Sequence, residues 1–524
     1  MRSRASGAEP DRAPGAEHDD VYGDVSDRAP DGRRAVLLAF GAAVVVVAGL
    51  QFVTPNLIGN DSYFHIRYAK VIRDAGLRGF PPPFPWLPLT ILAPDRYADH
   101  HMLFHVWLVP FTLGDLRLGG KLAGLAGAVL FVATFAWFLR RQGVGLVALA
   151  ILALGASSAD LLFRLNMTRV QALSLVCLLA GFHFALTDRK LALAIVGCVY
   201  AWLYDGFPLL FVPVGATFVA SWVCDRRFRP GIVLAAAAGV LVGLVCTPYF
   251  PAYFQFILHH FGDKLVPDDS LHVGREWFPY DPAELLANAL PSMLYVAFGA
   301  SVLGAVGFRR DTRGFAALLV AMVFLVLTLR SKRFVEYFGP TATVFVALAG
   351  WRTVAEWPRP RRLIVTALLV AVAAINAGGV AWTLMQKQRE TPHDRYAAAA
   401  RYVAEHAPPG AMLCSTDWDD FPWIYFYNVK STYLVGLDPT YLHDRYQDAY
   451  RRWVAASDGS LTRPSQVFGQ ELPCAYVLSD REHAAFLERA SHDPGFVQVL
   501  TDEQVVLYRV ERDGPPPVYP TSLP

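Results

Sequence analysis

The chain has 524 residues, of which 54% are hydrophobic and only 18% are charged. Soluble domains usually carry about 25% charged residues, so this composition indicates a protein whose main solvent is lipid. The formal net charge of +2 argues against a general binder of polyanions such as nucleic acid.

Runs of around twenty apolar residues are predicted to be transmembrane helices, because the hydrocarbon core of a bilayer is about 30 Å thick. Before the first run, residues 1–33 are rich in Ala, Gly, Pro, Asp and Arg, and we expect a disordered tail there. About eleven runs follow the tail, at 35–53, 119–139, 143–159, 170–187, 190–204, 206–223, 231–247, 287–307, 314–329, 335–351 and 363–383. They predict a membrane domain over 34–385 with two long outer loops, 54–117 and 248–285.

Basic residues mark every second connection between these runs. They are Arg33 and Arg34, Arg140 and Arg141, Arg189 and Lys190, Arg226, Arg227 and Arg229, Arg309, Arg310 and Arg313, and Arg359, Arg361 and Arg362. Since cytoplasmic connections are enriched in Lys and Arg, we expect a cytoplasmic N-terminus, a C-terminal domain outside, and a location in the cytoplasmic (inner) membrane. Segment 101–116 is also apolar, but counting it as a span would break the alternation, so it is predicted to be an amphipathic helix on the outer surface.

The last part of the chain, 390–524, is less apolar and is predicted to be a small extracytoplasmic α/β domain. The helix PHDRYAAAARYVAEHA precedes the strand AMLCSTD, and the later strand CAYVLSD precedes the helix REHAAFLERA. Cys414 and Cys474 lie in the two strands, and either a disulfide or two buried free thiols fits that placement. The sequence has no CxxC pair or Cys/His cluster that would indicate zinc.

Acidic and imidazole side chains gather in the first outer loop. Asp61, His65 and Tyr68 lie four and then three residues apart, so they share one face of a helix, and Asp99 and His100 end the same loop. A carboxylate beside an imidazole at a membrane surface can ligate a divalent cation such as Mg²⁺ or Mn²⁺, or take up a proton. The candidate metal ligands are therefore Asp61, His65, Asp99 and His100. The alternatives are an interfacial helix whose polar face meets water and, for Asp99, capping of the following helix.

Two groups of arginines fall on the predicted outer side, against the positive-inside trend. They are Arg164 and Arg169 in the connection 160–171, and Arg330 and Arg333 in the run RSKRFVEY. Guanidinium groups can hold a phosphate or an anionic headgroup through paired hydrogen bonds. A salt bridge to Asp160 or Asp205 is the alternative for the first group, and a contact with outer-leaflet lipid is the alternative for the second.

A third set of polar residues follows the predicted strand 411–417. Asp417, Trp418 and Asp419 lie in the loop after that strand, which is a typical place for a binding site. Glu276 lies beside a tryptophan in the second outer loop. All of these groups fall on one side of the predicted membrane, whereas unrelated polar loops would scatter over both sides. The pattern therefore indicates one extracytoplasmic site.

This arrangement resembles the GT-C glycosyltransferase superfamily, and most closely the catalytic subunits of oligosaccharyltransferases. The run DSYFHIR, 61–67, is similar to the family pattern D-x-Y-x-H-x-R that follows the first span. Arg333 in RFVEY looks like the family's lipid-phosphate arginine, with Arg330 as a helper. The run DWDDF, 417–421, corresponds to the family motif W-W-D-Y-G, of which it retains Trp418 and Asp419.

The resemblance implies a membrane enzyme that transfers a sugar or an oligosaccharide from a polyprenyl-phosphate or polyprenyl-diphosphate carrier to an extracytoplasmic protein, glycan or lipid acceptor. The implied roles are catalytic carboxylates at Asp61 and Glu276, carrier-phosphate binding at Arg333 and Arg330, and acceptor binding at Trp418, Asp419 and Asp417. The family's second acidic pair is missing from 160–171, where Arg164 and Arg169 would carry the phosphate charge instead.

Two other functions fit the same pattern. A transporter or flippase of lipid-linked intermediates would place charged residues near the bilayer midplane and show inverted repeats. A non-catalytic envelope assembly protein would use its C-terminal domain to bind a partner. With either function the lipid bilayer is a partner of the chain, and we expect no nucleic acid.

Overall fold

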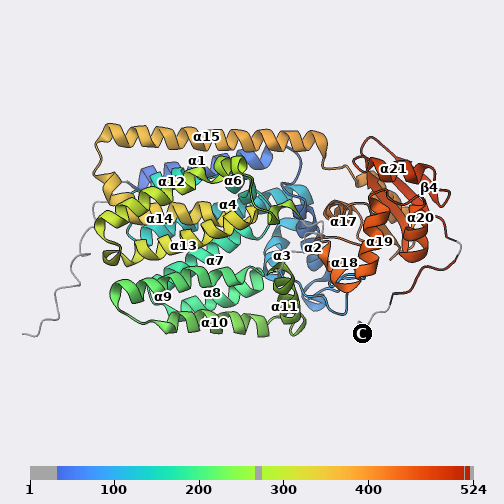
Figure 1. Cartoon of the computed structure of the whole chain (residues 1–524), viewed down its shortest axis with the longest axis horizontal. Helices are drawn as coiled ribbons and strands as arrows, with labels where there is room; N and C mark the ends of the chain where they lie inside the picture. The colour runs from blue at the N-terminus through green and yellow to red at the C-terminus, as the bar shows by residue number, and fades with distance from the viewer. Residues whose placement is uncertain (1–31, 266–273, 513, 520–524) are drawn as a thin grey trace, which may run out of the picture.

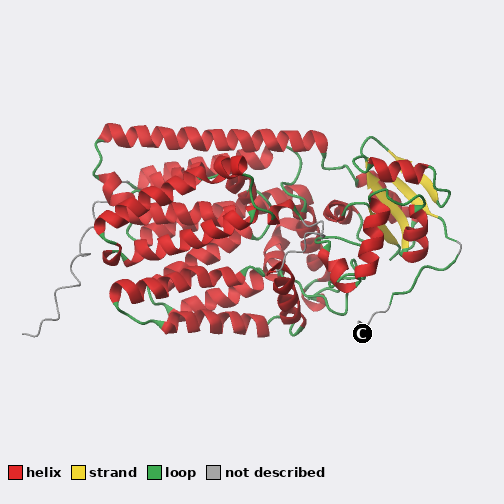
Figure 2. Ribbon diagram, in the orientation of Figure 1, coloured by secondary structure: helices red, strands yellow, loops and turns green. Residues whose placement is uncertain are grey.

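A computed structural model describes residues 32–265, 274–512 and 514–519 of the chain. The predicted disordered tail lies outside the described residues except for its last two positions. Long helices occupy the N-terminal part of the chain and lie mostly side by side along the longest axis of the molecule (Figure 1). All of the strands lie in a small unit at the C-terminal end (Figure 2). The long helices and the strands thus occupy different parts of the chain.

The long helices follow the predicted apolar runs. They are α1 (Arg33–Phe52), α4 (Leu116–Arg141), α5 (Val147–Ala156), α7 (Gln171–Leu186), α8 (Lys190–Leu203), α9 (Phe211–Asp225), α10 (Pro230–Val245), α12 (Pro282–Val306), α13 (Thr312–Arg330), α14 (Val335–Ala355) and α15 (Arg359–Glu390). Within the described residues, six helical stretches are long and apolar enough to cross a membrane, namely α1, α4, α9 with the turn before it (Phe207–Asp225), α12, α13 and α15. The chain is therefore an integral membrane protein.

Helix length alone does not determine the number of membrane spans. The short helix α6 (Ala159–Leu165) and α5 form a pair bent by 97°, which would add a seventh span that is broken in the middle. The apolar helices α7, α8 and α10 are shorter, at 14 to 16 residues. Each predicted run thus lies on a helix, while the count of eleven spans and their orientation remain predictions.

Helix starts are set by capping side chains at several of these positions. The carboxylate of Asp115 accepts a hydrogen bond from the N–H of Leu118 (2.8 Å), and Asp281 and Asp311 cap α12 and α13 in the same way.

Close helix packing depends on glycine at α10, where a Cβ on Gly239 would lie 2.0 Å from the carbonyl oxygen of Ala194 in α8. Only a residue without a side chain allows these two backbones to approach so closely.

Shorter elements connect the long helices at the end nearest the C-terminal unit. They are α2 (Asp61–Ala75), η1 (Leu77–Gly79), α3 (Met102–Leu108), η2 (Val109–Thr112), η3 (Phe207–Leu210), α11 (Ala252–Leu265), η4 (Arg275–Trp277) and η6 (Lys332–Phe334). The turn η5 (Phe308–Arg310) precedes α13 and lies at the other end of that helix from η6. The segment predicted as a surface amphipathic helix forms α3 and η2. Phe104 and Leu108 of α3 are buried against protein, so this segment packs inside the molecule to a greater extent than expected.

The C-terminal unit combines a five-stranded sheet with short helices. Its elements are α16 (Ala397–His406), β1 (Met412–Ser415), η7 (Trp418–Asp420), α17 (Phe421–Tyr427), β2 (Thr432–Tyr433), α18 (Thr440–Arg445), α19 (Gln447–Ser457), α20 (Pro464–Gln466), η8 (Val467–Glu471), β3 (Cys474–Asp480), α21 (Ala484–Ser491), β4 (Phe496–Thr501) and β5 (Val505–Val510). The strand order is β2-β1-β3-β5-β4. β1 pairs in parallel with β2 and β3, whereas β5 pairs antiparallel with β3 and β4. Both predicted strands and both predicted helices of this part are present.

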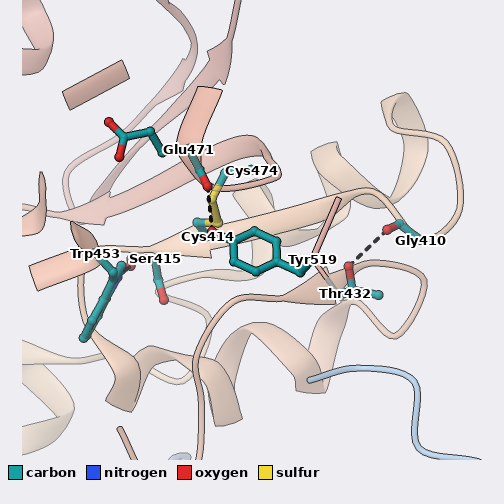
Figure 3. Close-up of a disulfide and its surroundings, with 8 residues drawn as sticks. All are labelled: Gly410, Cys414, Ser415, Thr432, Trp453, Glu471, Cys474 and Tyr519. Atoms are coloured by element: carbon teal, nitrogen blue, oxygen red, sulfur yellow. Dashed lines mark hydrogen bonds between the residues drawn. A yellow bond between two sulfur atoms is a disulfide. The ribbon is translucent and has the colours of Figure 1, made fainter. Parts of the chain in front are cut away.

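A disulfide joins the two central strands of this sheet, Cys414 of β1 and Cys474 of β3 (Figure 3). Their Cα atoms are 5.7 Å apart and both side chains are fully buried. The indole N–H of Trp453 donates to the carbonyl oxygen of Ser415 beside the bridge (2.8 Å). Of the two alternatives left open by the sequence, the structure has the disulfide. Such a bond is typical of compartments outside the cytoplasm.

Aromatic contacts fix the C-terminal unit against the first outer loop. The ring of Tyr63 in α2 stacks on Trp423 in α17, with the ring centroids 4.0 Å apart. The indole N–H of Trp86 donates to the carbonyl oxygen of Val429 (2.8 Å), and the backbone N–H of Tyr433 donates to the carbonyl oxygen of Trp86 (2.7 Å). These contacts hold η7 and α17 over the start of α2, which places the residues of both elements around one space.

Candidate active site

A cavity of about 320 Å³ lies where the outer loops meet the C-terminal unit. Its wall contains residues from α2, the α6–α7 connection, η4, η6 and η7, which are far apart in the sequence. The predicted site residues in this wall are Asp61, His65, Asp99, His100, Arg169, Glu276, Arg333, Trp418 and Asp419. The structure therefore brings most of the predicted polar groups into one place.

Asp61 lies in the first turn of α2 and forms an ion pair with Arg169, with Nη2 and Oδ2 2.9 Å apart. The backbone around Arg169 is tied to α2, because the N–H of Thr168 donates to the hydroxyl of Ser62 (3.0 Å). The hydroxyl of Thr168 in turn donates to the carbonyl oxygen of Gly120 in α4 (2.7 Å). The pairing of Asp61 with Arg169 is thus supported by the backbone on both sides.

Three guanidinium groups converge on the carboxylate of Glu276; we call Arg164, Arg169 and Arg333 the arginine cluster. The distances to Glu276 are 3.1 Å from Arg164 Nη2, 3.6 Å from Arg169 Nη1 and 3.2 Å from Arg333 Nη1. The side chains of the cluster are only 11–17% exposed. Burial raises the pKa of Glu276, but the three arginines outweigh burial and hold this pKa well below its usual range. Glu276 is therefore ionised at neutral pH.

Arg333 has two further contacts that fix its position. Its Nη2 donates to the hydroxyl of Tyr204 (2.9 Å), and its guanidinium lies 4.7 Å from the ring centroid of Trp277. A guanidinium packed on an aromatic face keeps its N–H groups directed to the side, where an anion can accept them. Since Arg333 lines the cavity, its plane is arranged for an oxyanion in that space.

Arg164 and Arg169 form salt bridges, but their partners differ from those that the sequence suggested. Arg164 pairs with Glu276 and, at 3.4 Å, with Glu336 of α14, whereas Arg169 pairs with Asp61 and Glu276. Asp160 instead accepts a hydrogen bond from the hydroxyl of Tyr280 (2.5 Å). In place of the expected bridge to Asp160 or Asp205, both arginines pair with Glu276, and Arg169 also pairs with Asp61.

Asp419 in η7 approaches the same group from the C-terminal unit. The side-chain amide of Asn60, next to Asp61, donates to Asp419 Oδ2 (2.5 Å). Asp417 accepts the backbone N–H of Asp419 (3.0 Å) and so shapes the turn without lining the cavity. Burial, together with the charges of Asp61 and Asp417, raises the pKa of Asp419 to about 7. This carboxyl consequently changes its charge near neutral pH.

A hydrogen-bonded chain of Asp99, His105 and His65 forms another part of the wall. Asp99 Oδ2 lies 2.7 Å from His105 Nδ1, and His105 Nε2 lies 2.8 Å from His65 Nδ1. The other oxygen of Asp99 accepts the N–H of His101 (3.0 Å), which resembles the predicted capping role. Burial, the neighbouring imidazole of His105 and the charge of Arg169 lower the pKa of His65 well below its ordinary value. His65 is therefore a neutral imidazole at neutral pH.

Among the predicted metal ligands, Asp61, His65 and Asp99 already have polar partners in the structure. Asp61 is occupied by Arg169, both oxygens of Asp99 accept hydrogen bonds, and Nδ1 of His65 is bonded to His105. Within the described residues, no group of three or more His, Cys, Asp or Glu side chains is arranged to hold a metal ion. A guanidinium would also repel a cation. At a separation of about 4 Å and an effective dielectric constant of about 20, the repulsion is about 4 kcal/mol per unit of positive charge.

Three predicted site residues lie outside the cavity wall. Arg330 ends α13 with an exposed side chain, and Arg164 and Asp417 act behind the wall through Glu276 and Asp419. The sequence reasoning did not single out His105, Glu336, Gln171 or Tyr204. The signal for His105 was its spacing of four residues from His101, and Glu336 was visible as an acid three residues after Arg333. No local pattern indicated Tyr204, whose contact with Arg333 depends on the tertiary fold.

Comparison with protein-family models and with curated proteins finds no match for the chain. Comparison with solved structures does find similar folds. The oligosaccharyltransferase of Archaeoglobus fulgidus in its apo form matches with a TM-score of 0.57 at 14% identity, over 92% of this chain and 75% of that one. The same protein, AglB, in complex with an inhibitory peptide and a dolichol-phosphate matches with a TM-score of 0.57 at 14% identity, over 87% and 71% of the two chains.

A second kind of enzyme has a similar fold. ArnT from Cupriavidus metallidurans bound to undecaprenyl phosphate matches with a TM-score of 0.56 at 16% identity, over 91% of this chain and 98% of that one. A further structure of the Archaeoglobus fulgidus enzyme, in complex with Zn and sulfate, matches with a TM-score of 0.52 at 13% identity, over 90% and 73% of the two chains. The chain therefore has a GT-C fold like that of an oligosaccharyltransferase, as the motif resemblance implied.

Proposed function

We propose that the chain is a membrane glycosyltransferase that transfers a sugar or an oligosaccharide from a polyprenyl-phosphate or polyprenyl-diphosphate carrier to an extracytoplasmic acceptor. The observation that carries this proposal is the convergence of the arginine cluster on one carboxylate at the wall of a cavity. Guanidinium groups bind phosphate oxygens in the same paired geometry with which they bind a carboxylate. The fold neighbours bound to dolichol-phosphate and undecaprenyl phosphate are consistent with such a ligand.

The orientation that we propose places this cavity outside the cytoplasm. About eleven spans over 34–385 would leave the N-terminus in the cytoplasm of a cell whose inner membrane holds the protein. The unit 390–524 would then lie outside, and its disulfide supports an oxidising compartment. The carrier lipid would reach the cavity from the outer leaflet.

The carrier phosphate would be bound by Arg333 and Arg169, with Arg164 behind them. Arg330, exposed at the end of α13, would contact the phosphate as the carrier approaches from the lipid. Binding would require Glu276 to share these guanidinium groups with the phosphate. The paired guanidinium groups already face the cavity, so little rearrangement of the arginines is needed.

In the transfer step, an acceptor oxygen or nitrogen forms a bond to the anomeric carbon while the bond from that carbon to the phosphate oxygen breaks. The electron pair of the broken bond remains on the phosphate, where fixed cations stabilise the developing charge. The proton of the acceptor passes to the carboxylate of Asp61, and Glu276 holds the arginine cluster in place. Direct displacement of this kind inverts the configuration at the anomeric carbon.

The acceptor would lie against η7. Trp418 and Asp419 line the cavity on that side, and Asp417 holds their turn. The indole of Trp418 offers an apolar face, while Asp419 and Asn60 offer hydrogen bonds. A protein, glycan or lipid acceptor group fits this combination.

The proposal is tested with the purified full-length protein in liposomes that contain undecaprenyl-phosphate-linked sugars. With water as the acceptor, we expect slow release of undecaprenyl phosphate and free sugar, and a loss of about 100-fold in this rate in Arg333→Ala and Asp61→Asn. Arg389→Ala, which removes an exposed arginine outside the site, is the matched control and should retain full activity. Movement of intact lipid-linked sugar across the bilayer without release would support a flippase and contradict the proposal, and so would full activity in both site variants.

A further inference from the structure

One guanidinium lies between two acidic side chains of the candidate site. Arg169 Nη2 is 2.9 Å from Asp61 Oδ2, and Arg169 Nη1 is 3.6 Å from Glu276 Oε2. Asp61 comes from α2 and Glu276 from η4, more than two hundred residues later in the chain. A positive charge that joins two carboxylates from separate elements stands where a bound cation would otherwise be needed to keep them together.

The residues around Arg169 favour a guanidinium at this point over a metal ion. Gln171, at the start of α7, also lines the cavity, and its buried Oε1 accepts no hydrogen bond from the described part of the chain. An amide at this position adds an oxygen but no negative charge. Asp61 and Glu276 each already pair with a guanidinium of the arginine cluster, so part of their negative charge is neutralised by fixed cations before any divalent ion could approach.

We propose that the guanidinium of Arg169 takes the place of a divalent cation between Asp61 and Glu276, so that this site works without a metal ion. This inference rests on the proposed function and deepens it. The Archaeoglobus fulgidus oligosaccharyltransferase in complex with Zn and sulfate has a similar fold.

An arginine in place of a metal ion has a consequence for Asp61 and Glu276. Arg169 forms ion pairs with Asp61 through Nη2 and with Glu276 through Nη1, and this placement fixes the direction of Asp61 toward the cavity. Its charge is permanent, since arginine does not lose its proton in proteins. Asp61 is thereby held facing the cavity, where its carboxylate can accept the proton of the acceptor, without dependence on the supply of a metal.

The test is a titration of Mn²⁺ into the purified full-length protein, followed by electron paramagnetic resonance, which reports free and bound Mn²⁺ without any donor. We expect the wild-type protein to leave Mn²⁺ free in solution. Arg169→Ala should bind one Mn²⁺ per chain at least tenfold more tightly than the wild type. The double variant Arg169→Ala with Asp61→Asn should lose that binding.

Two further variants separate the charge of Arg169 from its packing. Arg169→Lys keeps the positive charge and should leave Mn²⁺ free, and Arg389→Ala should behave as the wild type. Bound Mn²⁺ in the wild type that disappears in Asp61→Asn would overturn the inference, and so would failure of a folded Arg169→Ala, with a normal thermal unfolding transition, to bind Mn²⁺. A wild type that binds no metal and transfers no sugar would leave this inference standing while removing the proposed function.

Discussion

At the scale of single residues, the ion pairs around Glu276 determine what the site can hold. This one carboxylate neutralises part of the charge on three guanidinium groups, which are spaced in the sequence from 164 to 333. Removing one member of such a network leaves buried charges without a partner. Glu276 therefore stabilises the empty site by occupying the same N–H groups that an incoming phosphate would use.

This competition predicts the behaviour of Glu276→Gln. Loss of the carboxylate should lower the thermal unfolding temperature, because the three arginines then repel one another. Inorganic pyrophosphate should restore more of that temperature in the variant than it adds in the wild type, since ligand binding to the folded state stabilises it. Thermal unfolding in detergent micelles with and without pyrophosphate measures both effects. An equal shift in the two proteins would show that the guanidinium groups do not bind phosphate.

Asp419 predicts a pH dependence of stability. Its pKa is raised to about 7 in the folded state from an ordinary value of 3.8, chiefly by burial. The protonated form is therefore favoured by folding, and this contribution is lost as the pH rises through about 7. Relative to Asp419→Asn, the wild type should lose stability between about pH 4 and 7, with a slope of at most about 1.4 kcal/mol per pH unit, and the difference should level off above about pH 7. Thermal unfolding across that range would contradict this if the difference between the two proteins were constant.

The charged residues of the site were easier to predict from the sequence than the residues that contact them. Asp61, Arg333 and Asp419 stood out because they lie in short runs of polar residues between apolar segments. Tyr204 and Gln171 lie at the ends of apolar helices and carry no such signal, although they contact or line the same cavity. The predicted metal set stays a prediction, and the sequence did not reveal that Asp61 pairs with Arg169 and that His65 is hydrogen-bonded to His105.

At the scale of elements, the apolar runs predicted the helices well, since twenty apolar residues have few alternatives to a helix in lipid. The short elements that carry the site were harder to predict. The one-turn elements η4, η6 and η7 have only three residues each, and their geometry depends on tertiary contacts such as the hydrogen bond from Ser331 to the carbonyl oxygen of Glu276 (2.9 Å). Local propensity is too weak to specify turns of this length.

The disulfide between β1 and β3 predicts the stability of the C-terminal unit. It joins residues 60 positions apart, so the double change Cys414→Ser and Cys474→Ser should lower the free energy of unfolding by about 2–4 kcal/mol. Because η7 follows β1 directly, sugar transfer should fall as this unit loosens. Thermal unfolding and peptide mass spectrometry under non-reducing conditions measure the bond and its effect. The matched control is Cys224→Ser, which changes a free cysteine; equal stability of the two variants would argue against the bond.

At the scale of the whole molecule, the account depends on which side of the membrane the C-terminal unit faces. The alternation of basic residues predicts the outside, and the fold neighbours do not decide the orientation. Cysteine labelling in intact cells tests it, in a background with the four free cysteines, Cys177, Cys198, Cys224 and Cys246, changed to serine. Ser460→Cys, exposed in the C-terminal unit, should react with a membrane-impermeant maleimide from outside. Arg310→Cys should react only after permeabilisation, and the reverse pattern would contradict the proposed topology.

The overall architecture could be predicted from the motif resemblance because the order of apolar runs, outer loops and final α/β part extends over the whole chain. The way in which the C-terminal unit meets the outer loop could not, since the stacking of Tyr63 on Trp423 joins residues 360 positions apart in the sequence and leaves no local pattern. That contact decides whether Asp419 faces Asp61.

The central claim, that a lipid phosphate binds at the arginine cluster, is tested most directly by an electron cryomicroscopy structure of the full-length protein in a lipid nanodisc with undecaprenyl phosphate. The account predicts phosphate density within hydrogen-bonding distance of Arg333 and Arg169, with the isoprenoid tail leaving the cavity toward the bilayer. Phosphate density at the opposite end of the helices, beside Arg33 and Arg140, with none in the cavity would contradict it.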